Sequence, residues 1–175
     1  MQINPQIVAI IGPESAGKTT LCRQLGNHFG GSIVPEFARE FLTKTKGKYE
    51  QSDLLKIAEG QLKLEHQIIS NSTGSVFCDT DVLVVKVWHQ FKYHEGSAEI
   101  DEIFNRQSPR KYLLAYPDLD WQPDPLRENP NDLLEIFRFY EKTLKEIGAD
   151  YKVIRGTSDK RLNSAVDAIN QMKLD

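Results

Sequence analysis

The sequence has few cysteines, no long apolar run and no strong excess of charge of either sign. Its two cysteines, Cys22 and Cys78, lie beside apolar residues without the spacing of metal ligands, so we interpret them as buried free thiols in a reducing compartment. No apolar run approaches the roughly 18 residues that a membrane-spanning helix needs, so no membrane partner is expected. The net charge of −3 also argues against a nucleic-acid partner.

Further absences limit how the chain can be organised. Residues 1–11 have no basic segment before their apolar stretch, so we expect no signal peptide and a cytoplasmic location. The four histidines have no metal-ligand spacing, and we assign them no chemistry. Because repeats, low-complexity tracts and linkers are also lacking, we predict one domain over residues 1–175. The oligomeric state is not indicated.

Short apolar runs alternate with helical periodicity along the chain. The predicted strands are residues 6–11, 32–34, 75–78, 111–116 and 151–154. Helical patterns cover residues 18–29 and 82–91, and three more are expected to be capped by Ser52, Asn131 and Ser158. Strands separated by helices predict an α/β fold of three layers, in which a five-stranded parallel sheet is covered by helices on both faces.

The segment from Gly12 to Thr19 reads GPESAGKT and matches the phosphate-binding pattern G-x-x-x-x-G-K-[ST]. Gly12 and Gly17 permit backbone angles that let successive N–H groups converge on phosphate oxygens. Lys18 would bring a positive charge to the β- and γ-phosphates, and the Thr19 hydroxyl could bind Mg²⁺. We therefore predict ATP and Mg²⁺ as cofactors. The predicted nucleotide-binding residues are Gly12, Glu14, Ser15, Ala16, Gly17, Lys18, Thr19 and Thr20.

Acidic residues follow two of the predicted strands. Asp79 ends the run VFCD and Asp81 follows it, so either could hold a metal-bound water or the substrate hydroxyl. Either could instead cap the next helix. Glu36 follows the second strand at the same edge of the sheet, where it could accept a proton or bind a ribose diol. Its alternative role is to complement a helix dipole, and that of nearby Arg39 is a surface ion pair.

The proline-rich segment at about residues 117–130 is too polar for the interior of an element, and we interpret it as a lid. Arg127 within it could reach the transferring phosphate when the lid closes, or could be solvated. The basic segment 43–48 could be a solvated loop or a second lid. After the last strand, Gly156 and Thr157 could let the backbone approach adenine, although a plain turn would explain them as well.

A planar base could stack on an aromatic side chain near a helix end or loop. The candidates in the sequence are Tyr49, Trp88, Tyr93 and Trp121. Each of them could equally be part of the core or of a half-buried wall.

Taken together, these segments resemble the ribosylnicotinamide kinase domain of NadR-type proteins. The resemblance covers nearly the whole chain and is carried by GPESAGKTT, VPEFARE, IAEGQ, CDTD, VWHQFKY, YLLAYPDLDWQPDPLREN and IRGTSDKR. It implies a P-loop kinase fold and transfer of the ATP γ-phosphate to the 5′-hydroxyl of nicotinamide riboside. It also implies that Lys18 and Thr19 bind ATP and Mg²⁺, that Glu36 with Asp79 or Asp81 lies at the substrate and metal, and that Arg127 acts from the lid.

The chain departs from this family at Pro35. Some members have a tryptophan there, positioned to stack on nicotinamide, so here we expect Trp121 or Tyr93 to take that part. With Glu36, Arg39 and Asp81 they form the predicted substrate-binding set. The alternative functions are a kinase for another nucleoside, such as a deoxynucleoside, and a regulatory nucleotide-binding ATPase. A guanine-specific switch is disfavoured because the sequence has no N-K-x-D segment.

Overall fold

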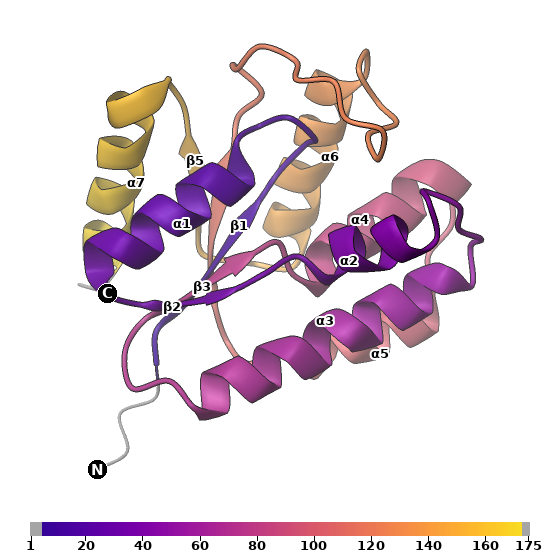
Figure 1. The fold of residues 1–175 in the computed structure, drawn as a ribbon, viewed down its shortest axis with the longest axis horizontal. Coiled ribbons are helices and arrows are strands. Elements are labelled where there is room, and N and C mark those ends of the chain that lie inside the picture. The colour runs from indigo at the N-terminus through magenta and orange to yellow at the C-terminus, as the bar shows by residue number, and fades with distance from the viewer. Residues whose placement is uncertain (1–4, 173–175) are drawn as a thin grey trace.

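The computed structural model describes residues 5–172, and a parallel sheet lies at its centre (Figure 1). The strands are β1 (Ile7–Ile11), β2 (Ser32–Val34), β3 (Val76–Asp79), β4 (Lys111–Ala115) and β5 (Tyr151–Ile154). Their order across the five-stranded sheet is β2-β3-β1-β4-β5, with every pair parallel. The central strand β1 is buried along its whole length, which explains its uninterrupted apolar sequence.

Helices connect successive strands and cover both faces of the sheet (Figure 1). They are α1 (Lys18–Phe29), α2 (Phe37–Lys44), α3 (Asp53–Ser70), α4 (Val82–Tyr93), α5 (Ala98–Asn105), α6 (Leu133–Glu146) and α7 (Ser158–Met172). The predicted three-layer α/β fold is confirmed. Within residues 5–172, no helix has the combination of length and apolar content that crossing a membrane requires.

The predicted helix starts need correction in detail. Ser52 lies at the N-cap position of α3, but its side chain makes no capping hydrogen bond. Asp132, not Asn131, is the N-cap of α6, and α7 already begins at Ser158. The helix α5 was not predicted, and α2 was considered only through the alternative role of Glu36 at a helix start. Each has only eight residues, about two turns, so its periodic signal is weak.

Alternate residues of β1 contribute to two separate cores. Ile7, Ala9 and Ile11 pack with residues of α4 and α6 on one face. Val8 and Ile10 pack with α1 and α7 on the other face, as the two helix groups on either side of the sheet in Figure 1 indicate. Cys22 and Cys78 are buried free thiols in these cores, as expected.

A third apolar cluster joins α2, α3, α4 and α5 beyond the edge of the sheet. It includes Ala38 of α2, Ile57 of α3, Val85 of α4 and Ile100 of α5. This cluster holds α2 and α4 in fixed positions on one side of the phosphate loop, and the side chains of both helices line the candidate site described next.

Candidate active site

The phosphate loop joins β1 to α1, as its sequence predicts. Gly12 has a φ of 138°, and an added Cβ would lie 2.6 Å from the main-chain oxygen of Ala115, so only glycine fits. Gly17 is the N-cap of α1 and has a φ of 72°. The N–H groups at the start of α1 therefore point out of the loop, where an anion can be bound.

Lys18 lies at the centre of the charged groups around this loop. Its Nζ donates a hydrogen bond to the main-chain oxygen of Pro13 at 2.7 Å. Burial lowers the pKa of Lys18, while the carboxylates of Glu36, Asp79 and Glu14 raise it. The three carboxylates favour the charged form of this buried lysine, and little water competes with an anion for its ammonium group.

Asp79 is the last residue of β3 and lies next to the start of α1. Burial raises the pKa of this carboxyl group, and a hydrogen bond from Thr19 partly opposes the rise. Its Oδ1 is buried without a hydrogen-bond partner among the described residues. A hydroxyl and an unsatisfied carboxylate oxygen are hard ligands that fit Mg²⁺, which needs few protein ligands when phosphates supply the others.

Asp81 does not join this group. It is fully buried, its Oδ1 accepts a hydrogen bond from the main-chain N–H of Leu83 at 3.0 Å, and it thereby caps α4. Its Oδ2 lies 3.4 Å from Nη1 of Arg110 and accepts a bond from the Tyr112 hydroxyl at 3.1 Å. The expected catalytic and substrate roles of Asp81 are corrected accordingly, because its carboxylate is used to cap a helix and pair with a buried arginine.

Glu36 enters the pocket from the residue before α2, and contacts with α3 fix its position. The main-chain N–H of Phe37 donates to Oε1 of Gln61 at 2.9 Å. The Phe37 ring lies against α3 at Gly60, where an added Cβ would be 2.2 Å from the ring. Burial raises the pKa of Glu36, and Lys18 lowers it to a lesser extent. Arg39 lies beside Glu36, with its Nε 3.8 Å from Oε2.

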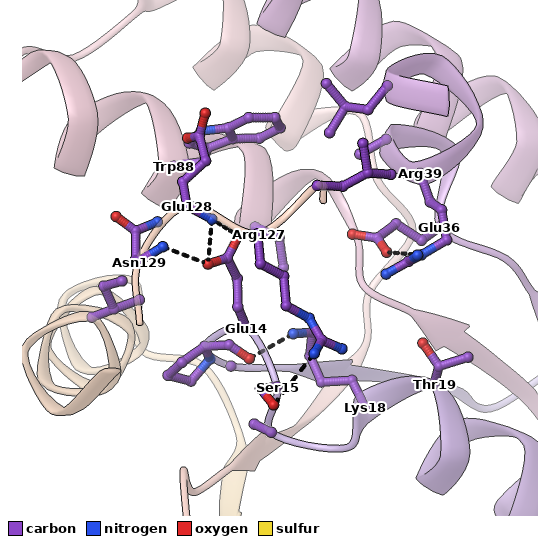
Figure 2. Close-up of a pocket in the computed structure, with 18 of the residues that line it drawn as sticks. Glu14, Ser15, Lys18, Thr19, Glu36, Arg39, Trp88, Arg127, Glu128 and Asn129 are labelled. Atoms are coloured by element: carbon purple, nitrogen blue, oxygen red, sulfur yellow. Dashed lines mark hydrogen bonds and ion pairs between the residues drawn. The ribbon is translucent and has the colours of Figure 1, made fainter. Parts of the chain in front are cut away.

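The lid, residues 117–130, folds over the phosphate loop (Figure 2). Oε2 of Glu14 accepts hydrogen bonds from the main-chain N–H groups of Glu128 and Asn129, at 3.1 and 2.9 Å. Ser15 Oγ accepts one from the N–H of Gln122 at 2.8 Å. Arg127 therefore lies above the loop, with Nη1 3.4 Å from Ser15 Oγ.

The far end of the same pocket is aromatic. Trp88 and Tyr49 line it, with their ring centroids 4.8 Å apart at an angle of 67°. Trp88 Nε1 donates to the Tyr49 hydroxyl at 3.0 Å, which in turn donates to Oε2 of Glu128 at 2.8 Å. With these polar atoms already bonded, the rings present apolar faces to the pocket.

The structure leaves the two favoured aromatic candidates outside this wall. Neither Tyr93 nor Trp121 is among the residues that line the pocket. Trp121 lies on the lid, with the Arg127 guanidinium 5.7 Å from its ring centroid. A signal for Trp88 was present in the sequence. Val84, Val87, Trp88 and Phe91 recur at the spacing of one helical face, and all four line the pocket.

Gly156 and Thr157 lie outside the pocket lining, in the loop before α7. That loop is tied to the phosphate loop by Arg161, which sequence reasoning did not single out. The buried guanidinium donates to the main-chain oxygens of Ala16, Tyr116 and Gly156 at 2.7, 2.9 and 2.8 Å. It also pairs with Oδ1 of Asp118 at 2.7 Å.

The remaining predicted residues fall as follows. Thr20 lines the pocket beside the nucleotide loop, and Gly47 of the basic segment 43–48 reaches its rim. The lysines of that segment, Lys44, Lys46 and Lys48, are exposed to solvent. The structure thus brings the phosphate loop, Glu36, Arg39 and Arg127 into one pocket with an aromatic far end.

Comparison with known sequences agrees with this geometry. A family model described as an AAA domain matches residues 7–161. The trifunctional NAD biosynthesis/regulator protein NadR of Escherichia coli is 25% identical over 174 residues, which are 94% of this chain and 42% of that protein. The NadR protein of Salmonella typhimurium is 28% identical over 126 residues, which are 69% of this chain and 30% of that protein. The chain thus spans less than half the length of either relative.

Solved structures share the fold. A NadR protein crystallised in complex with NR has a TM-score of 0.82 and 20% identity, over 96% of this chain and 50% of that one. A second NadR structure, in complex with NAD and AMP-PNP, has a TM-score of 0.78 and 20% identity, over 96% of this chain and 49% of that one. Thymidylate kinase from Ehrlichia chaffeensis has a TM-score of 0.65 at 15% identity over 98% of each chain. The fold is that of the P-loop kinases.

Proposed function

Because the chain belongs to the AAA domain family, we propose that it is an ATP-dependent kinase that phosphorylates the 5′-hydroxyl of nicotinamide riboside to give nicotinamide mononucleotide. One observation carries this proposal. The phosphate loop, the half-buried carboxylate of Glu36 and an aromatic wall line a single continuous pocket, so a triphosphate and a flat nucleoside could lie end to end.

The choice of acceptor rests on the relatives. The two NadR proteins act in NAD biosynthesis by name, and the structures with this fold hold NR in one case and NAD with AMP-PNP in another. The aromatic corner of Trp88 and Tyr49 suits a planar base that is bound by stacking and shape. In this proposal Trp88 and Tyr49 contact the base, in place of the Trp121 or Tyr93 that we expected to compensate for Pro35.

The charged residues of the site would have distinct roles in this reaction. The N–H groups of residues 12–19 and the Lys18 ammonium would bind the triphosphate, and Thr19 and Asp79 would hold Mg²⁺. The metal supplies neutralisation of phosphate charge. Glu36, whose pKa burial raises, would orient the acceptor hydroxyl and take up its proton. Arg127 would stabilise the charge of the transferring phosphoryl group.

We expect in-line transfer from ATP to the acceptor without a covalent enzyme intermediate. Positioning and charge neutralisation would then account for most of the rate enhancement, because phosphoryl transfer gives the protein little covalent chemistry to perform. Arg39 would act on the acceptor side of the pocket, next to Glu36.

A coupled ADP-release assay with ATP and Mg²⁺ tests the proposal. The acceptor panel should contain nicotinamide riboside, thymidine, deoxyadenosine and a control without acceptor. We expect the highest kcat/KM with nicotinamide riboside, and a product heavier by one phosphoryl group in mass spectrometry. A preference for a deoxynucleoside would replace the proposed acceptor. Slow ADP release that no nucleoside accelerates would indicate a regulatory ATPase instead.

A further inference from the structure

The side chain of Glu14 leaves the phosphate loop and contacts the lid. Its Oε2 accepts hydrogen bonds from two consecutive main-chain N–H groups, those of Glu128 and Asn129, and its Oε1 lies 3.2 Å from the first of these nitrogens. Figure 2 shows this carboxylate pointing at the lid backbone. A carboxylate in a loop that binds a triphosphate is electrostatically unfavourable unless it points away from the phosphates and is hydrogen-bonded. Here the carboxylate of Glu14 is stabilised by the two amide N–H groups of the lid.

Ser15, the next residue, holds the other side of the same lid segment. Its Oγ accepts a hydrogen bond from the N–H of Gln122 at 2.8 Å. The two contacts bracket Arg127, because Gln122 precedes it and Glu128 follows it directly. The guanidinium of Arg127 also donates to the main-chain oxygen of Gln122, within the bracketed segment.

We propose that Glu14 is a positioning residue for Arg127. By accepting hydrogen bonds from the N–H groups of the two residues after Arg127, it fixes Arg127 over the phosphate loop. The inference rests on the proposed function, in which Arg127 stabilises the transferring phosphoryl group. The charged acceptor makes stronger hydrogen bonds than a neutral side chain would. The loop that binds the nucleotide thereby also sets the position of the lid arginine.

Steady-state kinetics of Glu14→Ala test the catalytic part. We expect kcat to fall by up to about 100-fold, as a misplacement of roughly 1 Å can cause, while the KM for ATP changes much less. Glu14→Gln keeps one acceptor oxygen, so its kcat should lie between those of the wild type and Glu14→Ala. The matched control is Glu40→Ala, which removes an exposed glutamate of α2 that pairs with Lys44, and it should leave kcat unchanged.

A double-mutant cycle separates positioning from direct action. In an Arg127→Ala background, Glu14→Ala should lower kcat by less than about twofold, because Glu14 then has no arginine to place. Multiplicative losses from the two substitutions would overturn the proposal, since Glu14 would be acting independently of Arg127. A Glu14→Ala protein with normal kcat would overturn it as well.

Limited proteolysis tests the same contact without any activity. Arg127 is the only lysine or arginine between Lys111 and Arg138, so trypsin can cut the lid only at the bond before Glu128. We expect Glu14→Ala to be cut there several-fold faster than the wild type and Glu40→Ala, at equal melting temperatures. Equal cutting rates would overturn the proposed contact. If proteolysis supports the contact between Glu14 and the lid but no nucleoside is phosphorylated, the proposed kinase function is wrong and the contact still stands.

Discussion

The guanidinium of Arg161 donates a hydrogen bond to the main-chain oxygen of Ala16, 145 residues earlier in the chain, at 2.7 Å. The same group binds the loop before α7 and the end of β4, so three segments around the nucleotide loop share one buried cation. Because the Ala16 carbonyl belongs to the same peptide as the N–H of Gly17, this contact fixes the direction of an amide that would face the phosphates.

We predict that Arg161→Ala weakens both the fold and nucleotide binding. Removing one partner of a buried, hydrogen-bonded ion pair costs on the order of 3 kcal/mol of unfolding free energy, at the lower end of the usual range because Asp118 is partly exposed. Urea denaturation measures this loss, and titration calorimetry with an ATP analogue should show weaker binding in the protein that remains folded.

Arg161→Lys and Arg138→Ala are the comparisons for this prediction. Lysine keeps the charge but cannot donate in four directions, so it should recover only part of the stability. Arg138 is an exposed arginine of α6, and its removal should change neither measurement. Equal stability of Arg161→Ala and the wild type would contradict the role described for Arg161.

Asp79→Asn should stabilise the protein at pH 7 while removing activity. Burial raises the pKa of Asp79 above its ordinary 3.8, so the folded protein holds this proton more tightly than the unfolded chain. Wild-type stability therefore falls as the pH rises from below 3.8 through the raised folded pKa. Asparagine does not ionise, so its advantage in unfolding free energy should be present at pH 7 and disappear at the acidic end. We expect kcat to fall at least about 100-fold.

Thermal denaturation of both proteins between pH 3 and pH 8 measures that difference, together with Mg²⁺ titrations of activity. An Asp79→Asn protein that is less stable at pH 7 would show that the ionised carboxylate is favourable where it lies. An unchanged Mg²⁺ requirement would remove Asp79 from the predicted metal site.

Trp88→Ala should raise the KM for the acceptor about tenfold, because it removes one ring of the aromatic corner. Trp121→Ala should leave that KM nearly unchanged, since this ring lies on the lid beside Arg127. Initial-rate measurements at saturating ATP distinguish the two. The reverse result would restore the sequence-based expectation for Trp121.

Lys18→Ala should lower kcat about 10³-fold, because the variant lacks the charge expected to stabilise the transferred phosphoryl group. Its melting temperature should not fall, since burial disfavours the charged form of this lysine in the free protein. A substantial loss of stability would indicate that the carboxylates around Lys18 depend on it for folding.

The sequence was sufficient for the sheet because its three inner strands, β1, β3 and β4, are short runs that are buried almost throughout. It missed α5 and left α2 as an alternative, because eight residues are too few for helical periodicity to be recognised. The N-cap errors at Ser52 and Asn131 have another cause. The side chain of a serine or asparagine near a helix start can form hydrogen bonds with several nearby backbone groups, and the sequence does not show which of these bonds forms.

For the site, the sequence located groups held by the backbone and missed those that depend on where a side chain points. The phosphate loop and Asp79 follow from strand ends and glycines. Asp79 ends β3 and Asp81 lies two residues later, and the sequence does not show that Asp81 pairs with the buried Arg110 while Asp79 lies beside Thr19. Arg161 contacts residues more than 40 positions away, which no local pattern reveals.

Gly60 lies in the interior of α3, where alanine would favour the helix by roughly 1 kcal/mol. An engineer who seeks heat resistance from helix propensity would choose this substitution early. A methyl group there would meet the Phe37 ring at 2.2 Å, so the ring would have to leave α3 and draw the adjoining peptide from Gln61. Glu36 directly precedes Phe37 in the chain. A methyl group at Gly60 would therefore displace the expected proton acceptor, although Gly60 itself does not line the pocket.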